Sequence, residues 1–429
     1  MKVSRLLSTL FVAAVVTSAA AEDDDDFALC RADYFVFTPQ QPADPKLADP
    51  TRTGDGYNDH FQVLWDGARK LYYAFWTQAT KEGATDMHVV FSKSADRGRT
   101  WSAPRTIAGS ERICDPKPRA SWQQPMLAKS GRLYCLWNQQ ANDEALHHGI
   151  LCGAWSDDAG ETWSRPEENR SIPLQLRDDK SGRSLPNWCN WQRPLRLGAG
   201  GRYLVGCTRH VKPPDIVRSP GRPLGSWVEF WQFENIDENP EVRDIRITVL
   251  SGGEKALTIP IPGTDRFCCE EASLARLPDG RLFALVRSRA RHPFWSQSRD
   301  DGKTWSPPKP LVDADGRAFL HPNSPCPMYD IRGPEACSGE LFALVHDAYD
   351  DSIPPLGRQV RGPLYLIRGT FDPDGAQPVR FGRPEPFLPL KKDNSCYSSY
   401  TEADGETVLW FAHRKHRLVG RKVGPVRPK

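Results

Sequence analysis

The stretch Cys269–Trp305, CEEASLARLPDGRLFALVRSRARHPFWSQSRDDGKTW, contains the unit that the rest of the chain repeats. Its apolar residues alternate in part on both sides of the turn-forming dipeptide Asp279-Gly280, which predicts a β-hairpin. It closes on Ser298–Trp305, an octapeptide of the form S-x-D-x-G-x-T-W. In this form the Asp can cap a tight turn, the Gly permits an unusual φ, and the Trp fills space between strands.

The octapeptide recurs along the chain. Ser94–Trp101 and Ser156–Trp163 match it at every fixed position, and Thr370–Gly375 is a degenerate copy without the Trp. The first two copies start 62 residues apart, and the third starts 142 residues after the second, about two such periods. The recurrence predicts a repeat protein.

Six predicted hairpins follow one another at starts roughly 60 to 80 residues apart. They cover residues 57–76, 121–137, 190–207, 269–305, 327–346 and 396–413. This spacing leaves room for four strands per unit, so the chain is predicted to be all-β, a six-bladed β-propeller of four-stranded antiparallel blades. The isolated strand Asp33–Thr38 would close the ring by pairing with the last blade, which removes open edges.

The N-terminus has the pattern of a secretory signal in residues 1–21. Lys2 and Arg5 precede the apolar run Leu6–Val16, and small residues follow at Ala19–Ala21. The run is too short to span a membrane. We therefore expect export, to the periplasm or the medium, after cleavage near Ala21. An acidic leader, closing strand and Pro-rich linker would follow over 22–55, and one propeller domain over 56–429.

Composition excludes some partners and cofactors. The 429 residues carry a net charge of +3, with both signs interspersed, which argues against nucleic acid. Eleven cysteines, an odd number, leave the disulfide pattern open. Because the chain has no C-x-x-C motif and no His at metal-ligand spacing, we expect structural cysteines, no metal and no cofactor. We expect a monomer.

The innermost strands of a propeller line its central channel, so the polar residues that open each hairpin are expected to meet at one mouth. The candidates are Asn58, Asp59, His60, Trp122, Gln123, Gln124, Trp191, Gln192, Arg193, Glu270, Glu271, Tyr329 and Tyr397. Carboxylates, an Arg and tyrosines around one pocket suit an anionic or polyhydroxylated ligand. The alternative is that these side chains are only solvated.

The chain resembles the sialidase (neuraminidase) superfamily over residues 55–425. The resemblance rests on the three octapeptides, known there as Asp boxes, on EASLARLPDGRL (271–282), on PNSP (322–325) and on YSSY (397–400). The boxes mark the fold, and their own acids, Asp96, Asp158 and Asp300, are expected to make turns at the blade periphery.

The resemblance implies a Tyr nucleophile, an activating Glu, an Asp acid/base and three Arg that grip a substrate carboxylate. A phenol suits this role because an anionic nucleophile would be repelled by that carboxylate. The family pattern places the nucleophile at Tyr397 and its Glu at Glu271. Glu270 is rejected because strand alternation turns it away.

The substrate-binding residues follow from the same resemblance. Arg287, with Arg289 as fallback, matches the second Arg, and Arg361, with Arg358 as rival, matches the third. Trp122 and Trp191 are expected as stacking walls. The remaining candidate binding residues are Arg193, Asp59, His60, Gln124 and Tyr329.

The first blade departs from the family pattern. Residues 57–60 (YNDH) contain no Arg, although Arg52 lies a few residues upstream. The acid/base is assigned to Asp86, eight residues before Ser94, with Asp59 and Glu82 as alternatives. Losing one Arg of a bidentate clamp changes what a pocket prefers.

We therefore expect an exported, retaining exo-glycoside hydrolase that releases a terminal acidic sugar, sialic acid or a related ulosonic or uronic acid. One alternative is a non-catalytic propeller that binds glycans or a protein. Another is a lyase on uronic-acid polysaccharides that uses a Tyr with His60 or with His147 and His148.

Overall fold

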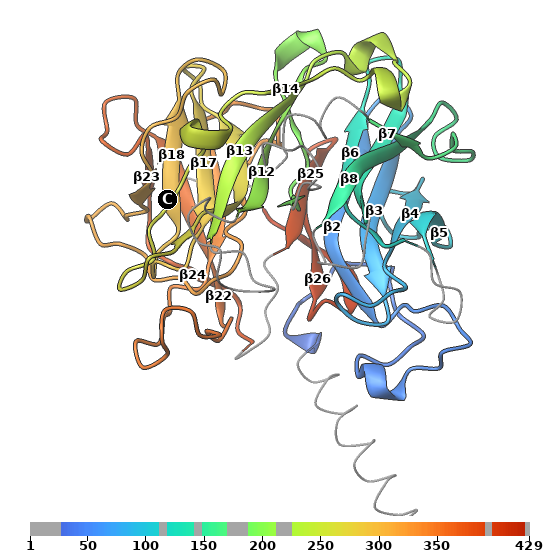
Figure 1. The fold of residues 1–429 in the computed structure, drawn as a ribbon, viewed down its shortest axis with the longest axis horizontal. Helices are drawn as coiled ribbons and strands as arrows, with labels where there is room; N and C mark the ends of the chain where they lie inside the picture. The colour runs from blue at the N-terminus through green and yellow to red at the C-terminus, as the bar shows by residue number, and fades with distance from the viewer. Residues whose placement is uncertain are drawn as a thin grey trace, which may run out of the picture.

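The computed structural model describes residues 27–110, 118–140, 148–169, 188–211, 225–390 and 397–424. The signal-like segment 1–21 and two of the cysteines, Cys114 and Cys396, lie outside these residues. Six sheets, almost entirely antiparallel, stand around a common centre and form a six-bladed β-propeller (Figure 1). The predicted fold class is confirmed.

Each blade runs from an inner strand outward. The strands of blades 1 and 2 are β2 (Tyr57–Asp66), β3 (Leu71–Ala79), β4 (His88–Ser94), β5 (Arg105–Gly109), β6 (Ala120–Leu127), β7 (Leu133–Gln140), β8 (Gly149–Ser156) and β9 (Glu167–Glu168). Those of blade 3 are β10 (Trp188–Cys189), β11 (Leu195–Arg196), β12 (Tyr203–Val211), β13 (Gly225–Phe233), β14 (Ile247–Val249) and β15 (Phe267–Cys268). Its inner edge is split, because β10 and β11 both pair with β12.

Blades 4 to 6 follow the same plan. Their strands are β16 (Glu270–Arg276), β17 (Leu282–Arg287), β18 (Phe294–Ser298), β19 (Lys309–Pro310), β20 (Met328–Asp330), β21 (Glu340–Val345), β22 (Leu364–Phe371), β23 (Val379–Phe381), β24 (Glu385–Leu388), β25 (Ser398–Ala403), β26 (Glu406–His413) and β27 (Arg417–Lys422). Blade 6 is completed by β1 (Tyr34–Phe37), which pairs antiparallel with β27. The N-terminal strand thus closes the ring as predicted.

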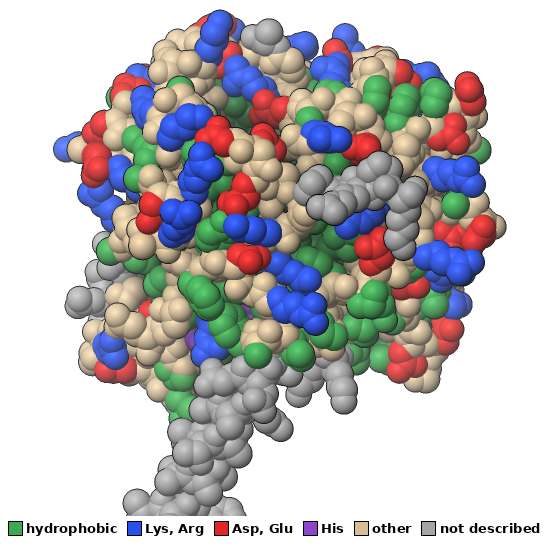
Figure 2. Space-filling model, turned by 180° about the vertical axis from the view of Figure 1, so that it is seen from behind, with side chains coloured by type: hydrophobic (Ala, Val, Ile, Leu, Met, Phe, Trp, Pro, Cys, Tyr) green, Lys and Arg blue, Asp and Glu red, His purple; other side chains and the backbone are tan. Residues whose placement is uncertain are grey.

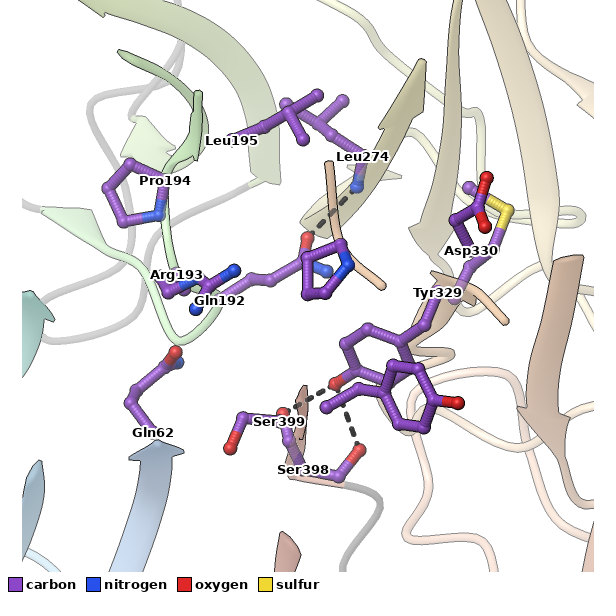
Figure 3. A pocket seen from close by; sticks show the side chains of 13 residues that line it. Gln62, Gln192, Arg193, Pro194, Leu195, Leu274, Tyr329, Asp330, Ser398 and Ser399 are labelled. Atoms are coloured by element: carbon purple, nitrogen blue, oxygen red, sulfur yellow. Dashed lines mark hydrogen bonds between the residues drawn. The ribbon is translucent and has the colours of Figure 1, made fainter. Parts of the chain in front are cut away.

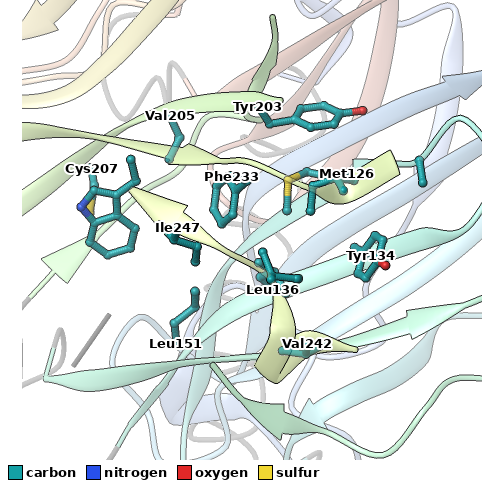
Figure 4. Close-up of a cluster of buried hydrophobic side chains, with 14 of the residues drawn as sticks. Met126, Tyr134, Leu136, Leu151, Tyr203, Val205, Cys207, Phe233, Val242 and Ile247 are labelled. Atoms are coloured by element: carbon teal, nitrogen blue, oxygen red, sulfur yellow. The ribbon is translucent and has the colours of Figure 1, made fainter. Parts of the chain in front are cut away.

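Apolar side chains fill the spaces between neighbouring blades. Between blades 2 and 3, Met126 and Leu136 pack against Val205 and Phe233, and all four are buried (Figure 4). Burying one such side chain contributes about 1.5–3 kcal/mol. These buried apolar contacts hold each blade against the next, and they therefore hold the inner strands in place around the channel.

The Asp boxes build the turns between the third and fourth strands. In the first box, Asp96 accepts hydrogen bonds from the Ser94 hydroxyl at 2.9 Å and from the Thr100 amide and hydroxyl at 2.9 and 2.6 Å. Gly98 has φ +84°, and a Cβ there would lie 2.8 Å from the Trp410 ring of blade 6. Asp158 and Asp300 make the same bonds. The box acids are turn-makers, as predicted.

Three inner strands share a bulge at the same position. The register shifts between Asp59 and Gln62 in β2, between Ser121 and Gln124 in β6, and between Glu270 and Ser273 in β16. Within each bulge one residue adopts a positive φ: His60 at 54°, Trp122 at 55° and Glu271 at 51°. A bulge breaks strict alternation and re-aims side chains.

Basic and acidic side chains are interspersed over the face drawn in Figure 2. No helix in the described ranges is long and apolar enough to cross a membrane. Of the nine cysteines within those ranges, eight are buried.

Candidate active site

A pocket of about 860 Å³ opens at the end of the channel where the inner strands begin. His60 of β2, Trp122 of β6, Glu271 of β16 and Tyr397, directly before β25, all line it. The bulges place the first three of these side chains there. Its charged walls hold six basic and three acidic side chains: Arg287, Arg289, Arg358, Arg361, Arg414, Lys415, Glu82, Glu270 and Glu271. The excess of positive charge suits an anionic ligand.

Tyr397 and Glu271 are in direct contact at the base of this pocket. The Tyr397 hydroxyl donates a 2.6 Å hydrogen bond to Glu271 Oε1. Arg287 Nη1 donates to the other carboxylate oxygen, Oε2, also at 2.6 Å, and lies 3.4 Å from the phenol oxygen. The three residues come from three different strand ends, and the fold brings them together as the resemblance implied.

The environment keeps the phenol protonated in the resting protein. Burial, and then the negative charge of Glu271, raise the pKa of Tyr397 well above its usual value, and Arg287 opposes them only in part. A phenol of this kind needs a base within hydrogen-bond distance to become a nucleophile. Glu271 is in that position.

Glu270 also faces the pocket, so the argument from strand alternation was wrong. The bulge between Glu270 and Ser273 lets both neighbouring acids point toward Arg287, whose Nε lies 3.3 Å from Glu270 Oε2. The Ser226 hydroxyl donates to Glu270 at 2.7 Å. Burial alone would raise the pKa of Glu270, but Arg287, His210 and Ser226 together lower it to about 2.

Asn323, in the PNSP segment, links the two predicted carboxylate-binding arginines. Its side-chain oxygen accepts from Arg287 Nε at 2.6 Å, and its carbonyl accepts from Arg361 Nη2 at 2.8 Å. Arg361 and both rivals, Arg289 and Arg358, line the pocket. Arg287 is largely occupied by its partners, so the other three are better placed to meet a ligand.

His60 and Trp122 form one wall. The Trp122 indole N–H donates to His60 Nε2 at 3.1 Å, and the His60 ring lies 5.0 Å from the Tyr397 ring in an edge-on contact. Burial lowers the pKa of His60, which favours the neutral imidazole that accepts this bond.

Lys415, at the turn between β26 and β27, was missed by the sequence argument. Its Nζ lies 3.0 Å from Asp59 Oδ2 and 3.1 Å from Glu82 Oε2, and it stands 5.4 Å from the centre of the Tyr397 ring. Although burial opposes it, the two acids raise the pKa of Lys415. The motif H-R-K-H carries no pattern that would have revealed this role.

The three candidate acids lie at different depths. Asp86 is buried, is bonded through Oδ2 to the Thr80 amide and hydroxyl at 3.0 and 2.7 Å, and does not line the pocket. Burial raises its pKa. Asp59 is buried behind Lys415, whereas Glu82 lines the pocket and is exposed at its rim. Arg52 lies at the surface, bonded to Gln40, and does not line the pocket either.

The remaining predicted residues do not line this pocket, so the polar residues do not all converge at one mouth. Trp191 is buried with its ring 5.5 Å from that of Tyr397, and Gln124 is buried within the channel. Arg193 and Tyr329 line a second, narrow pocket farther along the channel, where the Tyr329 hydroxyl donates to the Ser398 carbonyl at 2.6 Å (Figure 3). The inner strands are long enough to place successive residues at different depths.

Two further lining residues, Cys189 and His210, were not singled out from the sequence. The thiol lies 3.7 Å from His210 Nε2. Burial raises the pKa of Cys189 well above its usual value. His148 does not line the pocket, and His147 lies outside the described residues.

Comparison with known proteins agrees with this architecture. Residues 70–208 match the family of the BNR repeat-like domain. No curated protein sequence matches the chain. The NanB sialidase of Streptococcus pneumoniae superposes with a TM-score of 0.59 at 11% identity, over 90% of this chain and 69% of that one.

Two smaller proteins are matched over almost their whole length. An intramolecular trans-sialidase from Ruminococcus gnavus gives a TM-score of 0.58 at 13% identity, over 88% of this chain and 97% of that one. A protein of unknown function from Dyadobacter fermentans gives 0.55 at 13%, over 91% and 96%. Identities this low show the fold alone. The BNR repeat-like match is confined to residues 70–208, and the chain shares its propeller fold with these sialidases.

Proposed function

We propose that the protein is an exo-glycoside hydrolase that releases a terminal acidic sugar, sialic acid or a related ulosonic or uronic acid. The observation that carries the proposal is the 2.6 Å hydrogen bond from the Tyr397 phenol to Glu271, inside a pocket with an excess of basic side chains. A binding module has no need of a phenol bonded to a carboxylate that can take its proton.

The reaction follows from these contacts. Tyr397 Oη attacks the anomeric carbon while Glu271 takes the phenol proton, and the bond from that carbon to the leaving oxygen breaks. An acid protonates the leaving oxygen. In the second step water attacks the anomeric carbon and gives a proton to the acid that protonated the leaving oxygen, while the bond to Tyr397 Oη breaks and Glu271 returns its proton to the phenol. The configuration is therefore retained. Of the three predicted acids we favour Glu82, because it lines the pocket.

The substrate carboxylate would lie against Arg361, Arg289 and Arg358. Arg287 instead holds Glu271 and orients it toward the phenol. Its charge also stabilises the tyrosinate that forms as the proton leaves, and this lowers the cost of ionising a buried phenol. The neutral resting phenol does not repel an incoming anionic sugar.

Tyr397→Phe tests the proposal. Hydrolysis of a fluorogenic sialoside, and of a panel of uronic-acid and ulosonic-acid glycosides, should fall by at least about 10³-fold with the Phe variant, while sugar binding changes little. Tyr400→Phe, on the inner strand that begins directly after Tyr397 but outside this pocket, is the control and should retain activity. Undiminished turnover in Tyr397→Phe would disprove the nucleophile assignment.

A second candidate, a glycan-binding propeller without turnover, is favoured by one observation. The first blade offers no arginine to the pocket, and Arg52 is engaged with Gln40 at the surface. Saturable sugar binding by the wild-type protein, with no product from any glycoside of the panel, would support this candidate over the hydrolase.

Export of the mature protein belongs to the same proposal. It rests on the signal-like pattern of residues 1–21. Expression of the whole chain in a secreting host, followed by mass spectrometry of the N-terminus, should find a protein outside the cytoplasm that begins near Glu22.

A further inference from the structure

A wide pocket of about 600 Å³ opens at the end of the channel opposite the candidate active site. The two pockets are lined by opposite ends of the same strands: His60 and Trp65 both lie on β2, whereas Tyr397 lies directly before β25 and Glu402 lies near its far end. Five residues of strand separate the first pair, about 16 Å. We call this second opening, together with the narrow cavity of Figure 3 at its base, the distal pocket.

Side-chain amides close the channel between the two pockets. Gln62 donates to the Trp191 carbonyl, and Gln124 donates to the Asn190 carbonyl at 3.3 Å. Gln192 donates to the Ser273 hydroxyl at 2.7 Å. A ligand in the distal pocket is therefore separate from one at Tyr397.

Arg193 projects into the base of the distal pocket (Figure 3). Its neighbours hold its backbone, since Gln192 bonds to blade 4 and Leu195 pairs with Leu204. Within the described part of the chain, the Arg193 side chain forms no hydrogen bond and no ion pair. The other lining arginines all have acid partners: Arg69 bonds to Asp66, Arg196 to Asp237 and Arg332 to Glu340.

The rim of the distal pocket adds a carboxylate and an aromatic side chain to the Arg193 guanidinium. Glu335 lines the pocket and, in the described ranges, its carboxylate is likewise without a hydrogen bond or ion pair. Arg193 and Glu335 both line the wide pocket, and Pro334, the neighbour of Glu335, also lines the narrow cavity beside Arg193. The Trp65 ring lines it as well. A half-buried guanidinium, a free carboxylate and an aromatic face match a ligand with an anion, hydroxyl groups and an apolar face.

We infer that the distal pocket is a second binding site for a sugar acid of monosaccharide size, with the ligand carboxylate on Arg193 and its hydroxyl groups on Glu335. The site is separate from the proposed reaction at Tyr397, and the inference does not depend on turnover. It gives the propeller a glycan-binding face opposite its candidate active site.

The test is equilibrium binding of D-glucuronate, D-glucose and sulfate to the full chain, measured by calorimetry in an Arg361→Met background that weakens the first pocket. We expect Arg193→Met to lower the affinity for glucuronate at least tenfold. Glu335→Gln should lower the affinity for glucuronate less, and it should leave the affinity for sulfate unchanged. Arg202→Met, outside both pockets, is the control. Thermal unfolding shows whether each variant is folded.

Three results would overturn the inference. They are glucuronate binding that survives Arg193→Met unchanged, glucuronate that binds no better than sulfate or glucose, and a crystal soaked in glucuronate that shows no sugar at Arg193. Sugar density against Arg193, together with loss of binding in Arg193→Met, would establish the site even if every glycoside proved resistant to hydrolysis.

Discussion

At the residue scale, Glu270 and Glu271 show how one backbone conformation decides which side chains reach the pocket. In a regular strand they would face opposite sides of the sheet. The positive φ at Glu271 turns both toward Arg287, so a single guanidinium bonds to both carboxylates. Glu271 keeps an oxygen for Tyr397, whereas Glu270 bonds to Ser226. We assign proton transfer to the first and charge balance to the second.

The depressed pKa of Glu270 predicts a pH dependence of stability. A carboxyl whose pKa is lowered on folding contributes stability that is complete above its unfolded pKa, about 4.3, and is lost as pH falls through the folded value. The window for Glu270 is therefore roughly pH 4.5 to 2. Its contribution is on the order of 3 kcal/mol, because each pKa unit corresponds to about 1.4 kcal/mol.

Urea unfolding at a series of pH values checks this expectation. The unfolding free energy of the wild-type protein should fall steeply below about pH 4.5. Glu270→Gln should reduce the slope of unfolding free energy against pH by the equivalent of about one proton. Glu340→Gln, which removes an acid of blade 5 that makes an exposed ion pair with Arg332, is the control. Identical slopes in the wild-type and Glu270→Gln proteins would contradict the assigned pKa.

At the scale of the element, the Asp box acts as a turn clamp with no part in the chemistry. One carboxylate holds the serine before it and the threonine after it, and the glycine allows the chain to pass close to the preceding blade. The same clamp in blades 1, 2 and 4 explains why the sequence repeat is strong although the blades differ elsewhere.

Asp158→Ala measures the clamp. The variant loses three hydrogen bonds to one carboxylate, and we expect about 2 kcal/mol less stability with turnover unchanged. Asp157→Ala is the matched control, because the Asp157 carboxylate is exposed and, among the described residues, bonds only to Arg132, and such a pair contributes about 1 kcal/mol or less. Equal losses of unfolding free energy in the two variants would contradict the special role of the box.

At the scale of the whole molecule, the ring is closed by pairing the two ends of the described chain. The N-terminal strand β1 covers the edge of β27, and Tyr34 packs at 5.5 Å from Trp410 and donates to Glu406. Closure keeps blade 6 against blade 1, and Tyr397 of blade 6 must meet His60 of blade 1 and Glu271 of blade 4 across the channel.

Tyr34→Ala tests how much this closure stabilises the ring. Tyr34 is buried and Phe35 beside it is 56% exposed, so Phe35→Ala is the control on the same strand. We expect Tyr34→Ala to cost about 3 kcal/mol and Phe35→Ala about 0.5 kcal/mol or less. Equal unfolding midpoints in urea for the two variants would show that β1 contributes little to closure.

The sequence by itself determined the number and kind of blades, the ring-closing strand, the turn role of Asp96, Asp158 and Asp300, and the candidate pair Tyr397 and Glu271. The blades, the closing strand and the turns depend on local patterns, alternation and turn residues, that recur at a fixed period, whereas the candidate pair follows from the resemblance to the sialidase family. The tertiary structure alone decided which side chains share a pocket. It brought in Glu270 and Lys415 and left Asp86, Arg193 and Tyr329 outside, because bulges and depth along a strand are set by packing between blades.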